Sequence, residues 1–185
     1  MSSYIEKKFG LNGKVVIVSG ASRGIGNSIA SGLAKSGATV IGLGRTKISK
    51  KTDKFSFDYQ PCDVSDSNKF ELLCKEIFKK NNRIDGYIHV AGITNPNDDS
   101  LENFKNTINI NLTSTFSCCQ TIGKIMMEKG SGSIVNITSI GSELGFPNNP
   151  SCGASKGGVR ILSKSLALDF GSKNIRVNNI APGYI

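Results

Sequence analysis

The sequence predicts an α/β fold: a doubly wound, Rossmann-type parallel sheet of about six strands with helices on both faces. Short β-branched apolar runs alternate with longer segments of helical periodicity along the whole chain, which is the order of β-α-β units with right-handed crossovers. The apolar runs are continuous, as in strands that are covered on both faces. No internal repeat or linker interrupts the 185 residues, which predicts a single domain over 1–185.

The predicted strands are short, apolar and bounded by turn residues. The first, 15–18, consists entirely of β-branched residues and ends at Ser19-Gly20. The others lie at 39–43, 55–59 (the weakest), 86–90, 133–138 and 175–180.

Four helices are predicted between these strands, because apolar residues recur there at helical spacing. The first ends at Gly37, and the second begins at Asp66, whose carboxylate suits a helix N-cap, and ends at 81–82. The last two cover 101–129, as one long helix with a softer start, and 154–170.

Composition excludes several classes of protein. The apolar fraction of 38%, together with 21 glycines, is that of a globular chain rather than a disordered or fibrous one. No apolar run approaches the ~18–20 residues of a membrane span, and no leader precedes Leu11. Five cysteines without a CxxC or histidine pairing indicate reduced thiols rather than disulfides or zinc. We therefore expect a soluble, cytoplasmic protein with no metal site.

The net charge of +9 is concentrated partly in one segment, where Arg45, Lys47, Lys50, Lys51 and Lys54 face only Asp53 as a counter-charge. Such an excess is compatible with an anionic ligand, with nucleic acid, or simply with a solvated lysine-rich loop. The chain has neither an aromatic stacking platform nor a recognition-helix motif, so a nucleic-acid partner is not expected.

A glycine-rich turn lies between the first strand and the first helix. A sharp turn at Gly20, a bare backbone at Gly24 and close helix packing at Gly26 suit a pyrophosphate bound at the helix N-terminus. The strand before and the helix after the turn favour a dinucleotide over a ligand-free βα turn. The residues expected to bind it here are Gly20, Ser22, Arg23, Gly24, Ile25 and Gly26.

The spacing of these glycines is GxxxGxG. Together with Ser139, Ala154-Ser-Lys156 and Asn178 to Gly183, it resembles the short-chain dehydrogenase/reductase family, and most of all its 3-oxoacyl-thioester reductases. The resemblance covers about 11–185. Family members usually continue with a substrate-covering helix pair and a seventh strand, so we expect the sequence to be a fragment of a longer product rather than a chain that has lost its lid.

The resemblance implies a nicotinamide cofactor, and charge predicts which one. The second strand ends in Gly44-Arg45 without the carboxylate that would accept hydrogen bonds from a ribose 2′-hydroxyl. Arg45 and Arg23 would instead make charge-assisted bonds to a 2′-phosphate, which favours NADP(H). The alternative is that both are ordinary surface arginines.

Family motifs imply further cofactor contacts. Asp63 matches the aspartate at the adenine edge, with a helix N-cap as its structural alternative. His89-Val90-Ala91-Gly92 replaces the family's Asn-Asn-Ala-Gly, so His89 is expected to be a packing residue. The contacts implied after the glycine loop and Arg45 are Asp63, Val64, Ala91, Gly92, Lys156, Pro182, Gly183 and Ile185.

The family's catalytic set is Asn, Ser, Tyr and Lys. Asn111 matches the asparagine that holds a relay water, Ser139 the serine that donates to the substrate oxygen, and Lys156 the lysine that binds the nicotinamide ribose and lowers the pKa of the acid. Taken singly, Asn111 could bond backbone, Ser139 could end a strand and Lys156 could be a surface lysine.

The tyrosine is absent, because Cys152 stands four residues before Lys156. A cysteine sulfur ends nearly 4 Å closer to its backbone than a tyrosine hydroxyl, so it would need a bridging water to reach the substrate. Losing a positioned acid typically costs ~10²–10⁴ in rate. Cys152 is therefore either a weak thiol catalyst or a small filler of a repurposed site.

The sequence thus predicts NADP(H)-dependent reduction of a small-molecule carbonyl (a ketone, a 3-oxoacyl thioester or a sugar-like compound) to an alcohol, impaired by Cys152. The alternative is a non-catalytic NADP(H) sensor or scaffold. The resemblance also implies a homodimer or homotetramer, with the helices at 101–129 and 154–170 as the dimer face. No membrane partner is expected.

Overall fold

The computed structural model describes residues 8–46 and 55–184, which form one sheet with helices on both sides. All strand pairs are parallel, and the strand order is β3-β2-β1-β4-β5-β6. The predicted fold class is confirmed.

The strands occupy nearly the predicted positions. Their bounds are β1 Val15–Ser19, β2 Thr39–Gly44, β3 Asp58–Pro61, β4 Gly86–His89, β5 Gly132–Ile137 and β6 Ile175–Ile180. The helical elements are α2 Gly24–Lys35, α3 Ser67–Asn81, α4 Leu101–Ile108, the π-helical turn η1 Asn109–Thr113, α5 Ser114–Lys129, the 3₁₀ turn η2 Ile140–Ser142 and α6 Pro150–Gly171.

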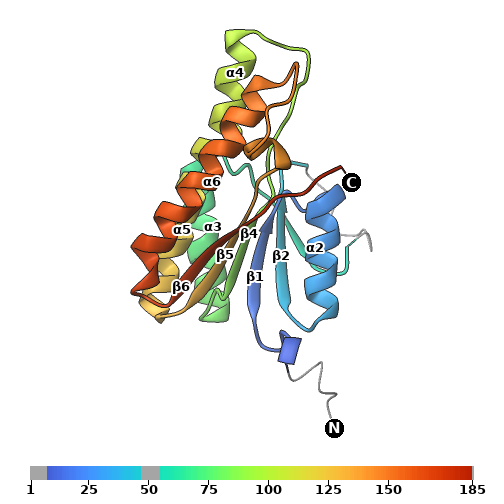
Figure 1. Ribbon diagram of the computed structural model, residues 1–185. Coiled ribbons are helices and arrows are strands. Elements are labelled where there is room, and N and C mark those ends of the chain that lie inside the picture. Colours follow the sequence, from blue (N-terminus) through green and yellow to red (C-terminus); the bar gives the residue numbers. More distant parts are fainter. Residues whose placement is uncertain (1–7, 47–54, 185) are drawn as a thin grey trace.

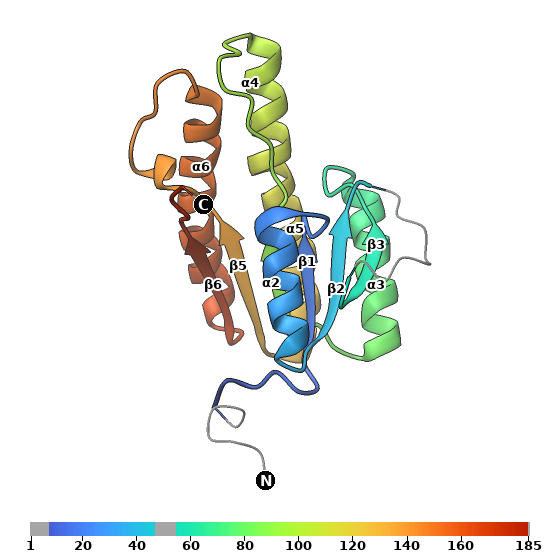
Figure 2. The same ribbon diagram turned by 90° about the vertical axis from the view of Figure 1, so that its right-hand side faces the viewer.

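The helices form two layers around the sheet. In Figure 1, α2 lies on one side, and α3, α5 and α6 lie on the other. Figure 2, turned by 90°, shows the sheet behind α2, with α4 and the start of α6 projecting beyond the carboxyl ends of the strands. The strand order reverses between β1 and β4, which are neighbours in the sheet, and a ligand is expected beyond their carboxyl ends.

The strands are apolar throughout because both sheet faces are buried. β1 is buried at every position, and its residues contribute to two clusters. The larger lies under α3, α5 and α6 and includes Phe70 and Tyr87, whereas the smaller lies under α2 around Val18 and Ala30. Within the described residues, no helix has both the length and the apolarity that crossing a membrane requires.

Three predicted boundaries differ from the structure. The third strand is 58–61 rather than 55–59, because only those residues pair with β2, while Phe55 stacks on Phe57 and on the Tyr59 ring. The last helix starts four residues before the predicted Ala154, with Pro150 in its first turn, a position that proline favours.

The predicted single helix over 101–129 contains the π-helical turn η1, which separates α4 from α5. Such a turn inserts an extra residue into the helix and often marks a functional site. Asn111 lies in this turn, and its side chain is completely buried.

An ion pair ties β1 to the segment before β4. Asp85 accepts hydrogen bonds from the Val15 backbone N–H at 2.9 Å and from Arg83 Nε at 2.6 Å. Burial on its own would raise the pKa of Asp85, but these hydrogen bonds and the charge of Arg83 outweigh it, and the pKa is lowered. The ionised carboxylate is therefore the form that stabilises the fold.

We expect Asp85→Asn to lower the free energy of unfolding by about 1–2 kcal/mol at neutral pH. Because the folded pKa lies below the unfolded value, the contribution of Asp85 is full above the ordinary carboxyl range and is lost as pH falls through the folded pKa. Urea unfolding of parent and variant at neutral pH and in acid should therefore show a difference that shrinks in acid. A difference of constant size would contradict the assignment to Asp85.

Candidate functional site

A cavity of about 300 Å³ opens at the carboxyl ends of the strands, where β1 and β4 lie side by side. It is lined by segments that follow β1, β2, β3 and β4, and by one residue of η1. The predicted cofactor residues that line it are Gly20, Ser22, Arg23, Gly24, Ile25, Gly26, Arg45, Asp63, Val64, Ala91 and Gly92.

The glycine turn has little room for side chains. Gly20 has a φ of 68°, and a Cβ there would lie 2.8 Å from the backbone N of Ala91. A Cβ at Gly26 would overlap the carbonyl oxygen of Gly20. The first glycine therefore permits the turn, and the third lets α2 start directly against it.

The N-terminus of α2 is free to bind an anion. Its N-cap, Arg23, makes no side-chain capping bond, and the first turn contains no acidic residue. The backbone N–H groups at this end, with the helix dipole, point a partial positive charge into the cavity. A phosphate would accept hydrogen bonds from these N–H groups and would be attracted by the partial positive charge.

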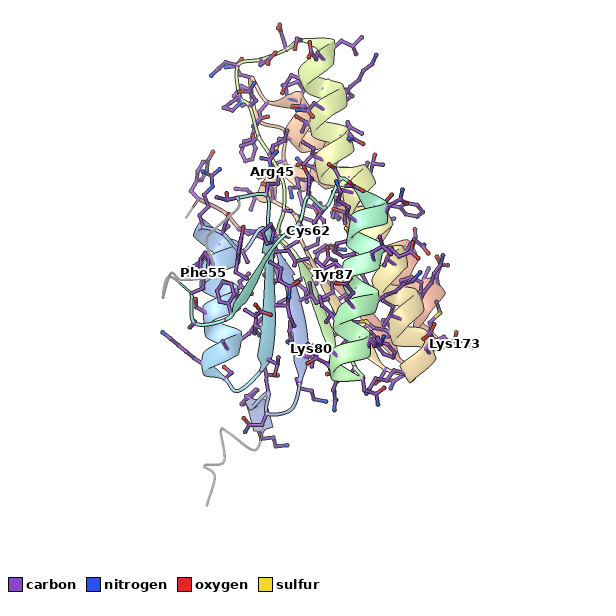
Figure 3. The ribbon with its side chains drawn as sticks, turned by 180° about the vertical axis from the view of Figure 1, so that it is seen from behind. Arg45, Phe55, Cys62, Lys80, Tyr87 and Lys173 are labelled. Carbon is purple, nitrogen blue, oxygen red and sulfur yellow. The ribbon has the colours of Figure 1, made fainter. Side chains whose placement is uncertain are left out.

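Arg23 and Arg45 add full positive charges at the rim. Both side chains are exposed, and neither forms an ion pair within residues 8–46 and 55–184. Figure 3 shows Arg45 at the carboxyl end of the sheet, close above Cys62. The lysines predicted to add to this charge, Lys47, Lys50, Lys51 and Lys54, lie outside the described residues.

Asp63 is the one acidic residue of the cavity lining. Its Oδ1 accepts hydrogen bonds from the N–H and the hydroxyl of Ser65, at 3.0 and 2.8 Å. The N-cap of α3 is Asp66, which accepts from the Lys69 N–H. The capping alternative for Asp63 is thus wrong, and its second carboxylate oxygen accepts no hydrogen bond from the residues that the structure describes.

Four lining residues were not predicted: Cys62, Val90, Ile93 and Ile110. Cys62 and Val90 are sequence neighbours of predicted contacts, so extending each motif by one residue would have found them. Ile110 enters through the π-helical turn, for which the sequence carries no signal that we recognise.

A second cavity, of about 310 Å³, holds the catalytic candidates Ser139 and Cys152. Ser139 Oγ accepts a hydrogen bond from the Gly141 N–H at 3.1 Å, and its own hydrogen has no acceptor among the residues described. The cavity is lined by Pro96, Ser139, Ile140, Phe146, Pro147, Asn149, Cys152, Gly183 and Tyr184.

Lys156 lies near residues of both cavities. It lies one helical turn after Cys152 on α6, and its Nζ donates to the Ile137 carbonyl at 2.7 Å. The same Nζ lies 3.5 Å from the position that a Cβ on Gly92, in the first cavity, would occupy. Lys156 is 9% exposed, and this burial lowers its pKa, whereas the neighbouring Cys152 thiol raises it. A surface lysine, the structural alternative, is excluded.

The other predicted cofactor contacts lie elsewhere or are not described. Pro182 accepts a hydrogen bond from the Ile140 N–H at 3.2 Å, and Gly183 lines the second cavity rather than the first. Ile185 lies outside the described residues.

Asn111 holds the loop after β4. Its Oδ1 accepts from the Ile93 N–H at 2.7 Å, and its Nδ2 donates to the Ile93 carbonyl and to Ser155 Oγ. Both amide hydrogens are therefore used within the protein. The side chain positions the Ile93 loop, and its role in holding a relay water stays a prediction.

His89 is a packing residue, as predicted. It is 2% exposed, and its Nδ1 lies 2.7 Å from the Tyr87 hydroxyl. Burial, together with the charge of Lys156, lowers the pKa of His89 to about 3, so the ring is neutral at physiological pH. All five cysteines are free thiols, and no group of three His, Cys, Asp or Glu side chains that could hold a metal occurs in the described part of the chain.

The chain is similar in sequence to known dehydrogenases and reductases. A family model described as short chain dehydrogenase matches residues 14–185. The 2-dehydro-3-deoxy-D-gluconate 5-dehydrogenase of Bacillus subtilis is 36% identical over 191 residues, which cover 98% of this chain and 75% of that protein. A 3-oxoacyl-[acyl-carrier-protein] reductase of Synechocystis is 32% identical over 187 residues, with coverage of 95% and 75%.

Among solved structures, a gluconate 5-dehydrogenase from Burkholderia cenocepacia in complex with NADP and tartrate superposes with a TM-score of 0.90. It is 29% identical in sequence, and the match covers 98% of this chain and 75% of that one.

Proposed function

The chain belongs to the short chain dehydrogenase family, and from that premise we propose that it is an NADP(H)-dependent oxidoreductase that reduces a carbonyl to an alcohol. The observation that carries the proposal is the cavity where β1 and β4 meet, which is lined by the N-terminus of α2 and by two arginines that form no ion pair with any described residue. These groups fit a nucleotide with a pyrophosphate and an additional phosphate.

The residues that would hold the coenzyme follow from the cavity lining. The glycine turn and the α2 N-terminus would bind the pyrophosphate, Arg23 and Arg45 the 2′-phosphate, and Asp63 the adenine edge. Lys156, whose Nζ lies close to Gly92, would bind the nicotinamide ribose. When bound in its reduced form, the coenzyme supplies a hydride to the carbonyl carbon.

The second cavity would hold the carbonyl compound. The Ser139 hydroxyl has a hydrogen to donate to a carbonyl oxygen, and the charge of Lys156 favours the developing alkoxide. Cys152 also lines this cavity, but its side chain is too short for the thiol to take the place of a tyrosine hydroxyl directly. The relatives named above act on sugar acids and 3-oxoacyl groups, and we propose the same range of ketones, 3-oxoacyl thioesters and sugar-like carbonyls here.

The test is NADPH oxidation by the purified chain with acetoacetyl-CoA and with 5-keto-D-gluconate as probe carbonyls. We expect saturable oxidation that depends on the carbonyl, at a rate below that of a family member with tyrosine. The competing candidate is a non-catalytic nucleotide sensor or scaffold, because position 152 is a cysteine. Tight NADPH binding without oxidation in the presence of either probe would support this second function instead.

Replacing Arg45 by alanine should weaken NADPH binding about 10- to 100-fold, because a charge-assisted bond to the 2′-phosphate is lost. NADH affinity should change little, since that nucleotide lacks the phosphate. The matched control is Lys173→Ala, which removes the same charge at the opposite end of the sheet (Figure 3). Fluorescence titration measures the affinity of the parent and of each variant for both nucleotides, and equal losses for NADPH and NADH in Arg45→Ala would contradict the assignment.

We also propose that the chain assembles as a homodimer or homotetramer through the α4–α5 and α6 layer. Large apolar side chains on these helices are exposed, among them Phe104, Phe116, Ile161 and Leu168. Burying such side chains is a common basis of association between copies. A monomer in sedimentation velocity at micromolar concentration would refute the proposal.

A further inference from the structure

We propose that Tyr184 donates the proton that the residue at position 152 cannot deliver to the substrate. The inference rests on the proposed reductase function and assigns its missing acid. Tyr184 follows β6 and lines the same cavity as Ser139 and Cys152. The proposed phenol thus comes from the segment after β6, whereas the family's tyrosine position, 152 in this chain, lies on α6.

Tyr184 differs from the other described tyrosines in having an uncommitted hydroxyl. The Tyr59 hydroxyl donates to the Thr46 carbonyl, and the Tyr87 hydroxyl is buried against His89. Tyr184 is 92% exposed, and its hydroxyl has no hydrogen-bond partner among the described residues. It can therefore donate to a molecule that enters the cavity.

The backbone holds the segment of Tyr184 beside the Ser139 loop. The Thr138 N–H donates to the Ile180 carbonyl at 2.8 Å, and the Ile140 N–H donates to the Pro182 carbonyl at 3.2 Å. These two bonds lie on either side of Ser139 in the sequence. The segment 180–182 therefore runs along the serine, and Tyr184 follows two residues later.

Ring contacts also link Tyr184 to the Ser139 loop. The Tyr184 ring meets Phe146 edge-on, with centroids 6.3 Å apart. Phe146 in turn packs over Gly141, where a Cβ would lie 2.9 Å from the ring and 3.4 Å from Ser139 Oγ. Phe146 thus contacts the Tyr184 ring and packs on the loop of Ser139, and all three residues line the second cavity.

The phenol has the length that the thiol lacks. By bond-length addition, a tyrosine hydroxyl ends nearly 4 Å farther from its backbone than a cysteine sulfur. The Tyr184 ring lines the cavity, so its hydroxyl can meet a carbonyl that is bound there. A donor outside a helix is less well oriented than one fixed on α6, which predicts a working but slower site.

The proton step balances with groups already named. The reduced nicotinamide nucleotide provides two electrons and one hydrogen, as hydride, to the carbonyl carbon. The π pair of the C=O bond moves to oxygen, where the Ser139 hydroxyl stabilises it. The Tyr184 O–H bond breaks, its proton forms the alcohol O–H bond, and the exposed phenolate regains a proton from water.

The experiment compares four forms of the full chain: parent, Tyr184→Phe, Cys152→Tyr and the double variant. With NADPH and 5-keto-D-gluconate, Tyr184→Phe should lower kcat about 10²-fold or more in the parent background. It should change kcat less than threefold when tyrosine stands at 152, because a second phenol then supplies the proton. NADPH affinity, measured by fluorescence, should be the same in all four.

A second measurement needs no turnover. With NADPH and D-gluconate, a reduced nucleotide and an alcohol that cannot react together, the tyrosine absorbance spectrum of the parent should shift, and that of Tyr184→Phe should not. Equal shifts in the two proteins would overturn the proposal.

The kinetic outcomes separate this inference from the proposed function. An equal loss in both backgrounds would mean that Tyr184 supports packing only, and no loss in the parent would likewise overturn its assignment as acid. A silent parent with an active Cys152→Tyr would overturn the inference and retain the family chemistry. Bound NADPH with no oxidation in any form would refute the reductase function, and the inference with it.

Discussion

We expect Gly26→Ala to reduce NADPH affinity at least 100-fold and to lower the free energy of unfolding by about 1–3 kcal/mol. The added Cβ would overlap the Gly20 carbonyl oxygen and lie 3.2 Å from Ala21 Cα. These are backbone atoms at the end of β1 and cannot move aside as a flexible side chain would. Either α2 tilts or the turn at Gly20 opens, and both displace the N–H groups that would bind the phosphates.

Gly32→Ala is the matched control, since it makes the same change on the same helix. A Cβ at Gly32 meets no atom within 4 Å, so alanine should raise stability by about 0.5–1 kcal/mol through helix propensity. Urea unfolding and NADPH titration of both variants measure the contrast. Similar behaviour of the two would show that the close contact at Gly26 does not control the turn.

The sequence was sufficient for the nucleotide cavity because its determinants are local. Gly20, Gly24 and Gly26 occupy one turn, and the neighbouring contacts follow the ends of strands whose apolar runs are easy to recognise. In a parallel sheet those ends must meet at one edge. The order of the strands and the placement of Arg45 and Asp63 then follow with little further information.

The second cavity could not be predicted to the same extent, because it joins segments that are distant in the chain. Pro96 and Tyr184 reach Ser139 only through tertiary contacts. The orientation of Asn111 depends on a π-helical turn, which its apolar periodicity does not reveal. Motif spacing was enough to identify the candidate catalytic and binding residues. The contacts that each of them makes could be found only from the folded structure.

We expect Lys156→Met to lower kcat/KM for NADPH-dependent carbonyl reduction by about 10²-fold or more without destabilising the protein. The Lys156 ammonium is buried and has one described hydrogen-bond partner, the Ile137 carbonyl. A buried charge with so few partners is costly to the fold. Methionine has a similar length and no charge, so it removes that cost.

The free energy of unfolding should therefore stay the same or rise by about 1 kcal/mol, with the loss of the bond to Ile137 limiting the gain. Lys164→Met, an exposed position on the same helix, is the matched control and should change neither activity nor stability. Urea unfolding and NADPH oxidation of both variants give the four values needed. If Lys156→Met lost stability and activity together, the lysine would be a structural anchor of α6 on β5. Loss of activity at constant stability would instead show that the protein tolerates a buried cation because the reaction requires its charge.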